Sequence, residues 1–285
     1  MIWRCANHQF ETGRQTLIMG IVNVTPDSFS DGGQLATTDD AVRHACELAD
    51  QGADIIDIGG ESSRPGAEPV SAEQELERIR PVIAELHRQR PELCISIDTV
   101  KAQVAEQALA AGASIVNDIS GLEHDPQMLA TVAASQAGCV IMHMQGAPRT
   151  MQRDPQYKDV VRDIMTYLEG RLAAALEAGI QRERICLDPG IGFGKTLAHN
   201  LELLRRLNEF NGLERPVLVG PSRKSFIGQA LELEVDQRQE GTIAACVAAS
   251  LNGAAAVRVH EVPPIRRALA LSDAIRTGTD GSETE

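Results

Sequence analysis

Polar side chains stand at the end of every short apolar run in this sequence, and their types suit ligand binding. Asp98, Asn117 and Asp188 offer oxygen atoms that accept hydrogen bonds, whereas Lys224 and Arg258 donate them and carry positive charge. One polar residue could end a run by chance, but all eight runs share the feature. We therefore predict one site to which every run contributes. The polar groups at the run ends are Asn23, residues 61–64, Asp98, Asn117, His143, Asp188, residues 222–224, and Arg258 with His260.

The apolar runs and the segments between them are the elements that must position these groups. The runs are continuously apolar, which is typical of parallel strands buried on both faces, and amphipathic segments of helical period separate them. The predicted strands are 17–24, 54–58, 93–97, 114–118, 138–142, 184–188, 216–219 and 255–259. The predicted helices are 38–51, 71–90, 100–111, 125–136, 158–179, 198–210, 239–251 and 263–276. This alternation favours an α/β fold, a single (β/α)8 TIM barrel whose active site lies at the carboxyl ends of the strands, over an open sheet.

Local signals mark several helix ends. Ser71 and Gln74 have the spacing of a capping box. Thr38 and Thr99 are placed to cap the helices that follow them. Pro81 lies inside the second predicted helix, where it should kink or interrupt the helix.

The chain shows no interdomain linker, so residues 1–276 are predicted to form one barrel domain. Residues 1–16 precede the first strand and are expected to form a short hairpin that closes the bottom of the barrel. Residues 277–285 (TGTDGSETE) have no apolar content, and we predict a disordered tail.

Composition excludes several classes of protein. The 285 residues sum to a net charge of −13, and such a surface repels nucleic-acid backbones. No apolar run approaches the roughly 18 residues of a membrane span, and the first residues lack the apolar region of a signal peptide. The six cysteines form no CxxC pair and mostly lie in apolar stretches. We therefore expect buried free thiols in a cytoplasmic protein with neither a nucleic-acid nor a membrane partner.

Two glycine-rich patterns approach nucleotide-binding motifs and fail at a required position. Residues 194–196 end like a P-loop, but the first glycine of that motif would fall on Pro189. Gly190 and Gly192 open like a dinucleotide fingerprint, but its third glycine would fall on Lys195. Neither pattern therefore predicts a nucleotide site.

Eight sequence blocks, in order along the predicted barrel, resemble those of the dihydropteroate synthase family. The blocks 23–33 and 59–66 are similar to the two signature loops of that family, and the resemblance extends over about residues 17–275. The blocks are 23–33 (NVTPDSFSDGG), 59–66 (GGESSRPG), 96–99 (SIDT), 117–119 (NDI), 142–146 (MHMQG), 188–195 (DPGIGFGK), 222–225 (SRKS) and 258–260 (RVH).

The resemblance implies a bacterial-type transferase of folate biosynthesis. Such an enzyme condenses 6-hydroxymethyl-7,8-dihydropterin diphosphate with 4-aminobenzoate, giving 7,8-dihydropteroate and diphosphate. The resemblance further implies Mg²⁺ as cofactor, a homodimer, and a pocket that sulfonamides enter as mimics of aminobenzoate.

The resemblance also implies which residues bind the pterin. Asp188 would accept hydrogen bonds from the 2-amino group and N3–H, and Asn117 would bind N1 and the amino group. Asp98 would accept from the remaining N–H edge, and Lys224 would donate to O4 or N5. Met142 would pack beside the ring, although a place in the ordinary barrel core is an equal alternative.

The diphosphate and its metal would be held by cations, hydroxyls and an amide. The implied diphosphate-binding residues are Ser63, Arg64, Arg258, Val259 and His260. Arg258 and His260, together with Lys224, would be catalytic by stabilising the departing charge. Asn23 would offer its amide oxygen to Mg²⁺.

Aminobenzoate needs an aromatic enclosure and a partner for its carboxylate. Phe29, Pro65 and Phe193 would enclose its ring. Ser225, at the start of a following helix, would bind the carboxylate.

Three alternatives remain open at this point. A methyltetrahydrofolate:corrinoid methyltransferase shares the carboxylate-lined pterin pocket but lacks blocks like 23–33 and 222–225. A non-catalytic paralogue that supports a partner enzyme would not need the intact polar set. A sugar-phosphate isomerase on the same fold would need an acid–base pair that the sequence does not show.

Overall fold

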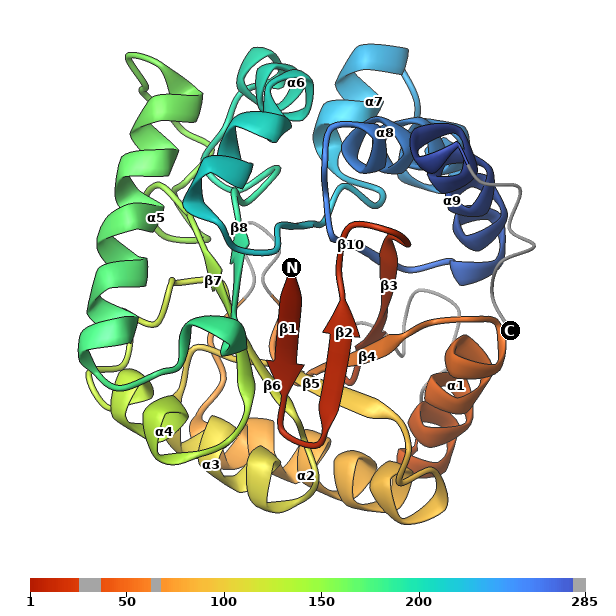
Figure 1. Ribbon diagram of the computed structural model, residues 1–285. Helices are drawn as coiled ribbons and strands as arrows, with labels where there is room; N and C mark the ends of the chain where they lie inside the picture. The colour runs from red at the N-terminus through yellow and green to blue at the C-terminus, as the bar shows by residue number, and fades with distance from the viewer. Residues whose placement is uncertain (26–36, 63–67, 279–285) are drawn as a thin grey trace.

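The computed structural model describes residues 1–25, 37–62 and 68–278, and within them eight parallel strands form a barrel. The strands lie in the order β8-β7-β6-β5-β4-β3-β10-β9. A parallel bridge between Leu187 and Val217 joins the two outer strands of this order and closes the ring. Helices surround the strands on the outside (Figure 1). The predicted (β/α)8 barrel is therefore confirmed.

The strands and helices follow the predicted order. The strands are β1 (Ile2–Cys5), β2 (His8–Glu11), β3 (Leu17–Asn23), β4 (Ile55–Gly59), β5 (Cys94–Asp98), β6 (Ile115–Asp118), β7 (Gly138–Met142), β8 (Ile185–Asp188), β9 (Leu218–Val219) and β10 (Ala256–Val259). The helices are α1 (Thr38–Asp50), α2 (Ala72–Gln89), α3 (Ala102–Ala110), α4 (Met128–Ala134), α5 (Val160–Glu177), α6 (Leu197–Arg205), α7 (Ser225–Leu231), α8 (Gln239–Leu251) and α9 (Val262–Thr277).

The N-terminal ends of α1 and α2 are capped by side chains, one at the predicted residue and one at its neighbour. Ser71 and Gln74 form the predicted capping box at the start of α2. The cap of α1 is Thr37 and not the predicted Thr38, because the Thr37 side chain accepts from the backbone N–H of Asp40. Thr38 is itself the first helical residue.

A second cap expectation was wrong, and of the two effects expected at Pro81, an interruption of the helix does not occur. Thr99 does not cap α3: its hydroxyl accepts from the N–H of Lys101, and the first helical N–H, at Ala102, donates to Asp125. Pro81 does not interrupt α2, which is continuous. Pro81 lies on the solvent side, so water can satisfy the carbonyl that loses its helical donor.

The N-terminal hairpin of β1 and β2 lies across the bottom of the barrel, as predicted (Figure 1). Trp3 and Cys5 are fully buried against the first residues of the barrel strands. The Trp3 indole Nε1 donates to the carbonyl of Arg184 at 3.2 Å. The hairpin therefore seals this end of the barrel with apolar side chains.

The barrel interior has an apolar lower layer and a polar upper layer. Because side chains alternate along a strand, every second residue points inward. In β4, Ile55 belongs to the apolar cluster under the hairpin, and Asp57 is the next inward residue toward the carboxyl end. In β8, Cys186 and Asp188 repeat this order. The polar groups thus gather above a sealed floor.

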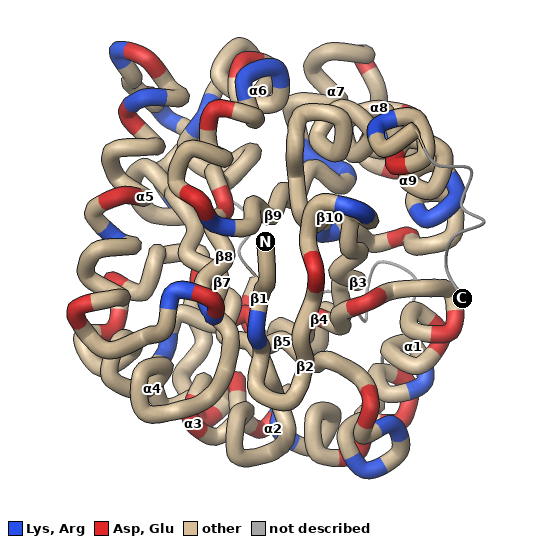
Figure 2. The backbone as a smooth tube through the Cα atoms, in the orientation of Figure 1, with Lys and Arg blue, Asp and Glu red and all other residues tan. Residues whose placement is uncertain are grey.

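The charged side chains lie mostly on the outside of the barrel (Figure 2), and the cysteines are free, as expected. Most Lys, Arg, Asp and Glu lie on the outer helices and their connections (Figure 2). All six cysteines are free, and all but the partly exposed Cys46 are buried. Within the described residues, no helix is both long and apolar enough to cross a bilayer. Of the predicted tail, Thr277 ends α9 and Gly278 follows it, while the rest lies outside the described residues.

Candidate active site

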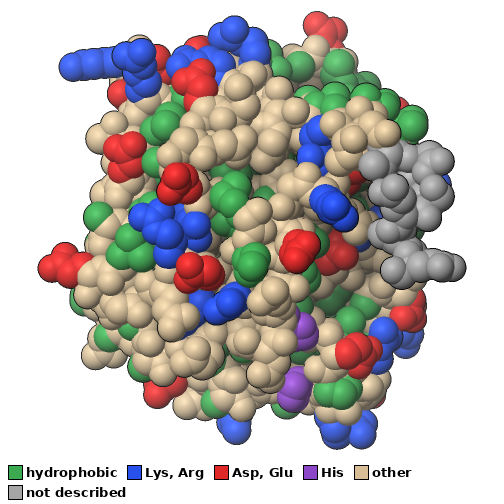
Figure 3. Space-filling view, in the orientation of Figure 1, with side chains coloured by type: hydrophobic (Ala, Val, Ile, Leu, Met, Phe, Trp, Pro, Cys, Tyr) green, Lys and Arg blue, Asp and Glu red, His purple; other side chains and the backbone are tan. Residues whose placement is uncertain are grey.

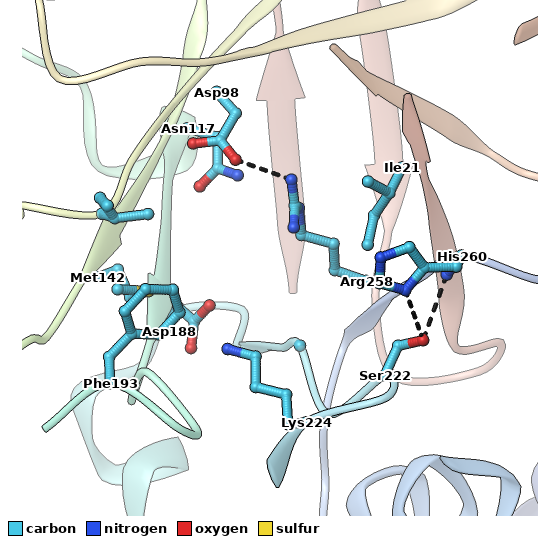
Figure 4. Close-up of a pocket in the computed structure, with 12 residues that line it drawn as sticks. Ile21, Asp98, Asn117, Met142, Asp188, Phe193, Ser222, Lys224, Arg258 and His260 are labelled. Atoms are coloured by element: carbon cyan, nitrogen blue, oxygen red, sulfur yellow. Dashed lines mark hydrogen bonds and ion pairs between the residues drawn. The ribbon is translucent and has the colours of Figure 1, made fainter. Parts of the chain in front are cut away.

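A pocket opens at the carboxyl ends of the barrel strands, where the sequence predicted it. Its lining comes from strands on all sides of the barrel and from the loops after β8 and β9 (Figure 4). The lining residues are Ile21, Asp98, Asn117, Ile119, Met142, Asp188, Phe193, Gly220, Ser222, Lys224, Arg258 and His260. Eight residues predicted from the sequence are thereby brought together: Asp98, Asn117, Met142, Asp188, Phe193, Lys224, Arg258 and His260.

Asp188 ends β8 with its carboxylate directed into the pocket (Figure 4). The backbone N–H of Gly190 donates to Asp188 Oδ1 at 2.6 Å, which fixes the carboxylate plane. Burial raises the pKa of Asp188, while the Gly190 bond and the charge of Lys224 oppose the rise. Asp188 is therefore a buried hydrogen-bond acceptor that faces the pocket (Figure 4).

Arg258 crosses the pocket floor and joins two carboxylates. Its Nε donates to Asp57 Oδ2 at 2.6 Å, and its Nη2 donates to Asp98 Oδ2 at 2.8 Å. Burial disfavours the charge of Arg258, but Asp57 and Asp98 more than offset this, so its pKa is raised. These two bonds use two of the five guanidinium N–H groups, which leaves donors for an anion.

Asp57 is a central polar group that sequence reasoning missed. It is fully buried in β4, and its Oδ2 accepts from Asn117 Nδ2 at 3.1 Å as well as from Arg258. Its Oδ1 is buried without a protein hydrogen-bond partner. The bond to Asn117 turns the amide nitrogen toward Asp57, so one side chain orients two pocket residues. Its position two residues before the end of β4 was the available signal.

Two pocket groups titrate near neutral pH. Burial lowers the pKa of Lys224 to about 7, although the charge of Asp188 opposes the shift. Burial also raises the pKa of Asp98 to about 7, with Arg258 limiting the rise and Asp57 adding to it. Small electrostatic changes in the pocket therefore alter the charge of both groups.

Ser222 orients His260 at the edge of the pocket. Its hydroxyl lies 2.9 Å from His260 Nδ1 and accepts from the backbone N–H of the same residue at 3.3 Å (Figure 4). A hydroxyl can donate to Nδ1 or accept from it, so this contact orients the His260 ring in either tautomer. The SRKS block contained Ser222, but its type gave no sign of this contact.

Phe193 and Lys224 form the wall opposite Arg258. Lys224 Nζ lies 3.9 Å from the centre of the Phe193 ring and donates to the carbonyl of Ile191. Both side chains come from loops after neighbouring strands of the barrel, β8 and β9. An aromatic face and a cation therefore stand beside the carboxylate of Asp188.

Other predicted residues lie apart from the pocket lining. Val259 is buried in the layer between strands and helices, so only its backbone can reach a ligand. Asn23 ends β3 next to Gly59. Ser225 is exposed at the start of α7 and lines a second cavity beside the pocket. The predicted residues Phe29, Ser63, Arg64 and Pro65 lie outside the described residues.

Comparisons with known proteins agree with this site. The family described as pterin binding enzyme matches residues 19–260. A dihydropteroate synthase of Synechocystis is 47% identical over 267 residues, covering 93% of this chain and 92% of its own length. The chain belongs to the dihydropteroate synthase family. Two solved structures of that family superpose closely on the chain.

The Yersinia pestis dihydropteroate synthase with a sulfonamide drug has a TM-score of 0.92 and 42% identity. It covers 97% of this chain, which in turn covers all of it. The Xanthomonas albilineans dihydropteroate synthase with 4-aminobenzoic acid has a TM-score of 0.89 and 44% identity, with 96% and 98% coverage. The chain is thus a transferase of folate biosynthesis, and the family resemblance read from the sequence is confirmed. The methyltransferase, isomerase and non-catalytic alternatives find no support in these matches.

Proposed function

We propose that the pocket at the carboxyl ends of the barrel strands binds 6-hydroxymethyl-7,8-dihydropterin diphosphate through Asp188, Asn117 and Lys224. The convergence of these three side chains from separate strands and loops carries the proposal. The 2-amino group and N3–H of the pterin are adjacent donors that match the two oxygens of Asp188. Lys224 donates to O4 or N5, and Met142 packs against the ring. Analogues that lack these groups leave buried partners unpaired and bind poorly.

The diphosphate leaves toward the cationic side of the pocket. The bond from the exocyclic methylene carbon to the diphosphate oxygen breaks, and the electron pair departs with the oxygen. Arg258 and His260 donate hydrogen bonds to the oxygens on which this charge develops. The backbone of Val259 lies between them, and Ser63 and Arg64 complete the proposed diphosphate set. No protein nucleophile is needed, because the dihydropterin ring itself stabilises positive charge at the methylene carbon.

The amine of 4-aminobenzoate forms the new bond. Its nitrogen attacks the methylene carbon and then loses a proton, giving dihydropteroate and diphosphate. Phe193 supplies one face of the ring site, and the Ser225 hydroxyl receives the carboxylate at the pocket edge. Phe29 and Pro65 are proposed to complete the enclosure. Closing the site keeps out water, which would compete with the amine.

Mg²⁺ is proposed as a cofactor held mainly by the substrate. Within the described part of the chain, no group of three or more His, Cys, Asp or Glu side chains could hold a metal ion. Mg²⁺ does not need such a cluster, because it keeps several waters and binds through substrate phosphates with one or two protein oxygens. Asn23, at the carboxyl end of β3, would offer its amide oxygen. When bound, the metal would neutralise charge on the diphosphate.

The functional unit is proposed to be a cytoplasmic homodimer. Leu201, Leu231 and Leu251 are 47%, 51% and 48% exposed on the neighbouring helices α6, α7 and α8. Apolar side chains gather over the α7 and α8 side of the molecule at the upper right of Figure 3. A second copy would bury these leucines. Equilibrium sedimentation should give twice the chain mass, and a monomer at micromolar concentration would contradict the proposal.

The condensation itself is tested with purified protein, Mg²⁺, the pterin diphosphate and 4-aminobenzoate. Dihydropteroate should form only when both substrates are present, and a sulfonamide should inhibit by competing with aminobenzoate. Absence of turnover by correctly folded protein would refute the proposed function.

A further inference from the structure

In the loop that follows β8, side chains donate to four consecutive backbone carbonyls, those of residues 191–194. The carbonyls of Ile191 and Gly192 accept from Lys224 Nζ and Gln152 Nε2. The carbonyl of Phe193 accepts from Lys195 Nζ at 2.8 Å, and that of Gly194 accepts from the Tyr157 hydroxyl at 2.8 Å. Residues 190–194 are buried or half-buried, so their carbonyls need partners within the protein. Side-chain donors from four different positions therefore hold four consecutive carbonyls and keep this loop in one conformation.

The glycines of the loop allow it to pack closely against its neighbours. Gly190 and Gly194 have φ values of +70° and +61°. A Cβ atom at Gly190 would lie 1.9 Å from the carbonyl oxygen of His143, and one at Gly194 would lie 2.4 Å from that of Gln145. The loop thus rests directly on the segment that follows β7. The backbone cannot shift toward that segment. The position of Phe193 therefore depends on the donor to its own carbonyl, which is Lys195.

Lys195 is buried, with an exposed fraction of 3%, and it bonds only to uncharged acceptors. Its Nζ lies 2.8 Å from the Phe193 carbonyl, 3.1 Å from His143 Nδ1 and 3.5 Å from the His143 carbonyl. Three acceptors match the three N–H groups of protonated Lys195, and they partly offset the burial that lowers the pKa of Lys195. His143 accepts as a neutral ring, since burial and the charge of Lys195 lower its pKa to about 3. An apolar side chain would avoid burying the charge but would leave these acceptors without a donor.

We propose that Lys195 is a positioning residue that fixes Phe193 as the wall of the aminobenzoate site. Its bond to the Phe193 carbonyl and its bond to His143 join the loop to the end of β7. The Phe193 ring then stays over Lys224, at 3.9 Å from its Nζ. This role rests on the proposed function, in which Phe193 encloses the second substrate. The Asp188 carboxylate is oriented by the Gly190 N–H and has no bond to Lys195, so Lys195 acts on the pterin anchor only through its charge, which favours ionised Asp188.

The test compares Lys195→Met with a matched buried cation far from the site. In Lys195→Met, we expect the KM for 4-aminobenzoate to rise about tenfold, as for the loss of a hydrogen bond to a charged donor. The KM for the pterin diphosphate should rise less, because Lys195 acts on Asp188 through its charge and not through a bond. The control is Arg184→Met. Arg184 is also 3% exposed and donates at 2.7 Å to the carbonyls of Val132 and Ala137 near the barrel bottom. Its loss should lower the unfolding midpoint and leave both KM values unchanged.

A double-mutant cycle separates positioning from general destabilisation. In a Phe193→Ala background, adding Lys195→Met should change the KM for aminobenzoate by less than about twofold, because no ring remains to be positioned. An undiminished effect in that background would overturn the proposal, as would an equal rise of both KM values. If Lys195→Met does not fold, Tyr157→Phe is tested in its place, because it removes the hydrogen bond to the neighbouring Gly194 carbonyl. This variant should raise only the KM for aminobenzoate. An unchanged KM would count against the proposal. Failure of the proposed function would instead appear as absence of wild-type turnover.

Discussion

Replacing Asp188 with Asn tests the pterin anchor most sharply. The Gly190 N–H, which donates to Asp188 Oδ1 at 2.6 Å, would keep the amide oxygen of the new side chain on its own side. The amide NH₂ would then occupy the position of the second carboxylate oxygen. That group donates hydrogen bonds, and so do the pterin groups that face it. The substitution thus turns an acceptor toward the ligand into a donor while preserving shape.

The size of the effect follows from these contacts. A hydrogen bond to a charged group contributes about 1.5–3 kcal/mol, and two such bonds to the pterin are weakened or lost. We expect a loss of about 3–5 kcal/mol of binding free energy, which corresponds to roughly 100- to 4,000-fold in Kd. Folding should change little, because burial already disfavours the charge of Asp188 and the Gly190 bond is kept. The unfolding midpoint should stay within about 3 °C.

The assay is titration calorimetry with 6-hydroxymethylpterin, which lacks the diphosphate. The matched control is Asp118→Asn, because Asp118 is likewise a buried carboxylate at the end of a strand, β6, and accepts from Ser120 without lining the pocket. The control should keep its pterin affinity within about threefold. Unchanged affinity in folded Asp188→Asn would refute the anchor role.

Three further predictions concern the pH response, the His260 contact and the hairpin. The affinity for 6-hydroxymethylpterin should peak near pH 7. Lys224 loses its proton as the pH rises through about 7, and Asp98 loses its negative charge as the pH falls through about 7. Lys224→Arg should remove the alkaline limb in calorimetry between about pH 5.5 and 9, and an unchanged limb would contradict the assignment. Ser222→Ala should lower kcat about tenfold and leave pterin affinity unchanged, with recovery in Ser222→Thr; a kcat equal to wild type would mean that the contact does not orient His260. Trp3→Ala should cost about 3–5 kcal/mol in denaturant unfolding without changing either KM, and a changed KM would argue against a purely structural hairpin.

The fold could be predicted from the sequence because the apolar runs, their number and their alternation with helical segments all indicate the same architecture. Continuous apolar runs specified buried parallel strands, and their number and alternation with helices specified a barrel. The position of the site followed, since strand ends must meet at one mouth. Cap positions were harder to predict. Thr37 and Thr38 have the same side chain, and only the backbone conformation of Thr37 decides which one caps α1.

Contacts between distant strands could not be predicted from the sequence. Arg258 and Asp57 are 201 residues apart, and their pairing depends on the register of the closed barrel. Lys195 was noticed only in two failed nucleotide patterns and as the last residue of the block 188–195, although its side chain is buried and bonds to three acceptors. The type of a residue predicts which bonds it can make, whereas its partners are set by tertiary packing.

The central claim is that one pocket brings an amine to the pterin carbon from which diphosphate leaves. Measuring diphosphate and dihydropteroate together in the same reaction tests this claim most directly. We predict equal amounts of the two products with wild-type protein, and a parallel loss of both in Arg258→Met. Diphosphate released without dihydropteroate in the presence of saturating aminobenzoate would show that water, and not the amine, reaches the carbon, and would contradict the account.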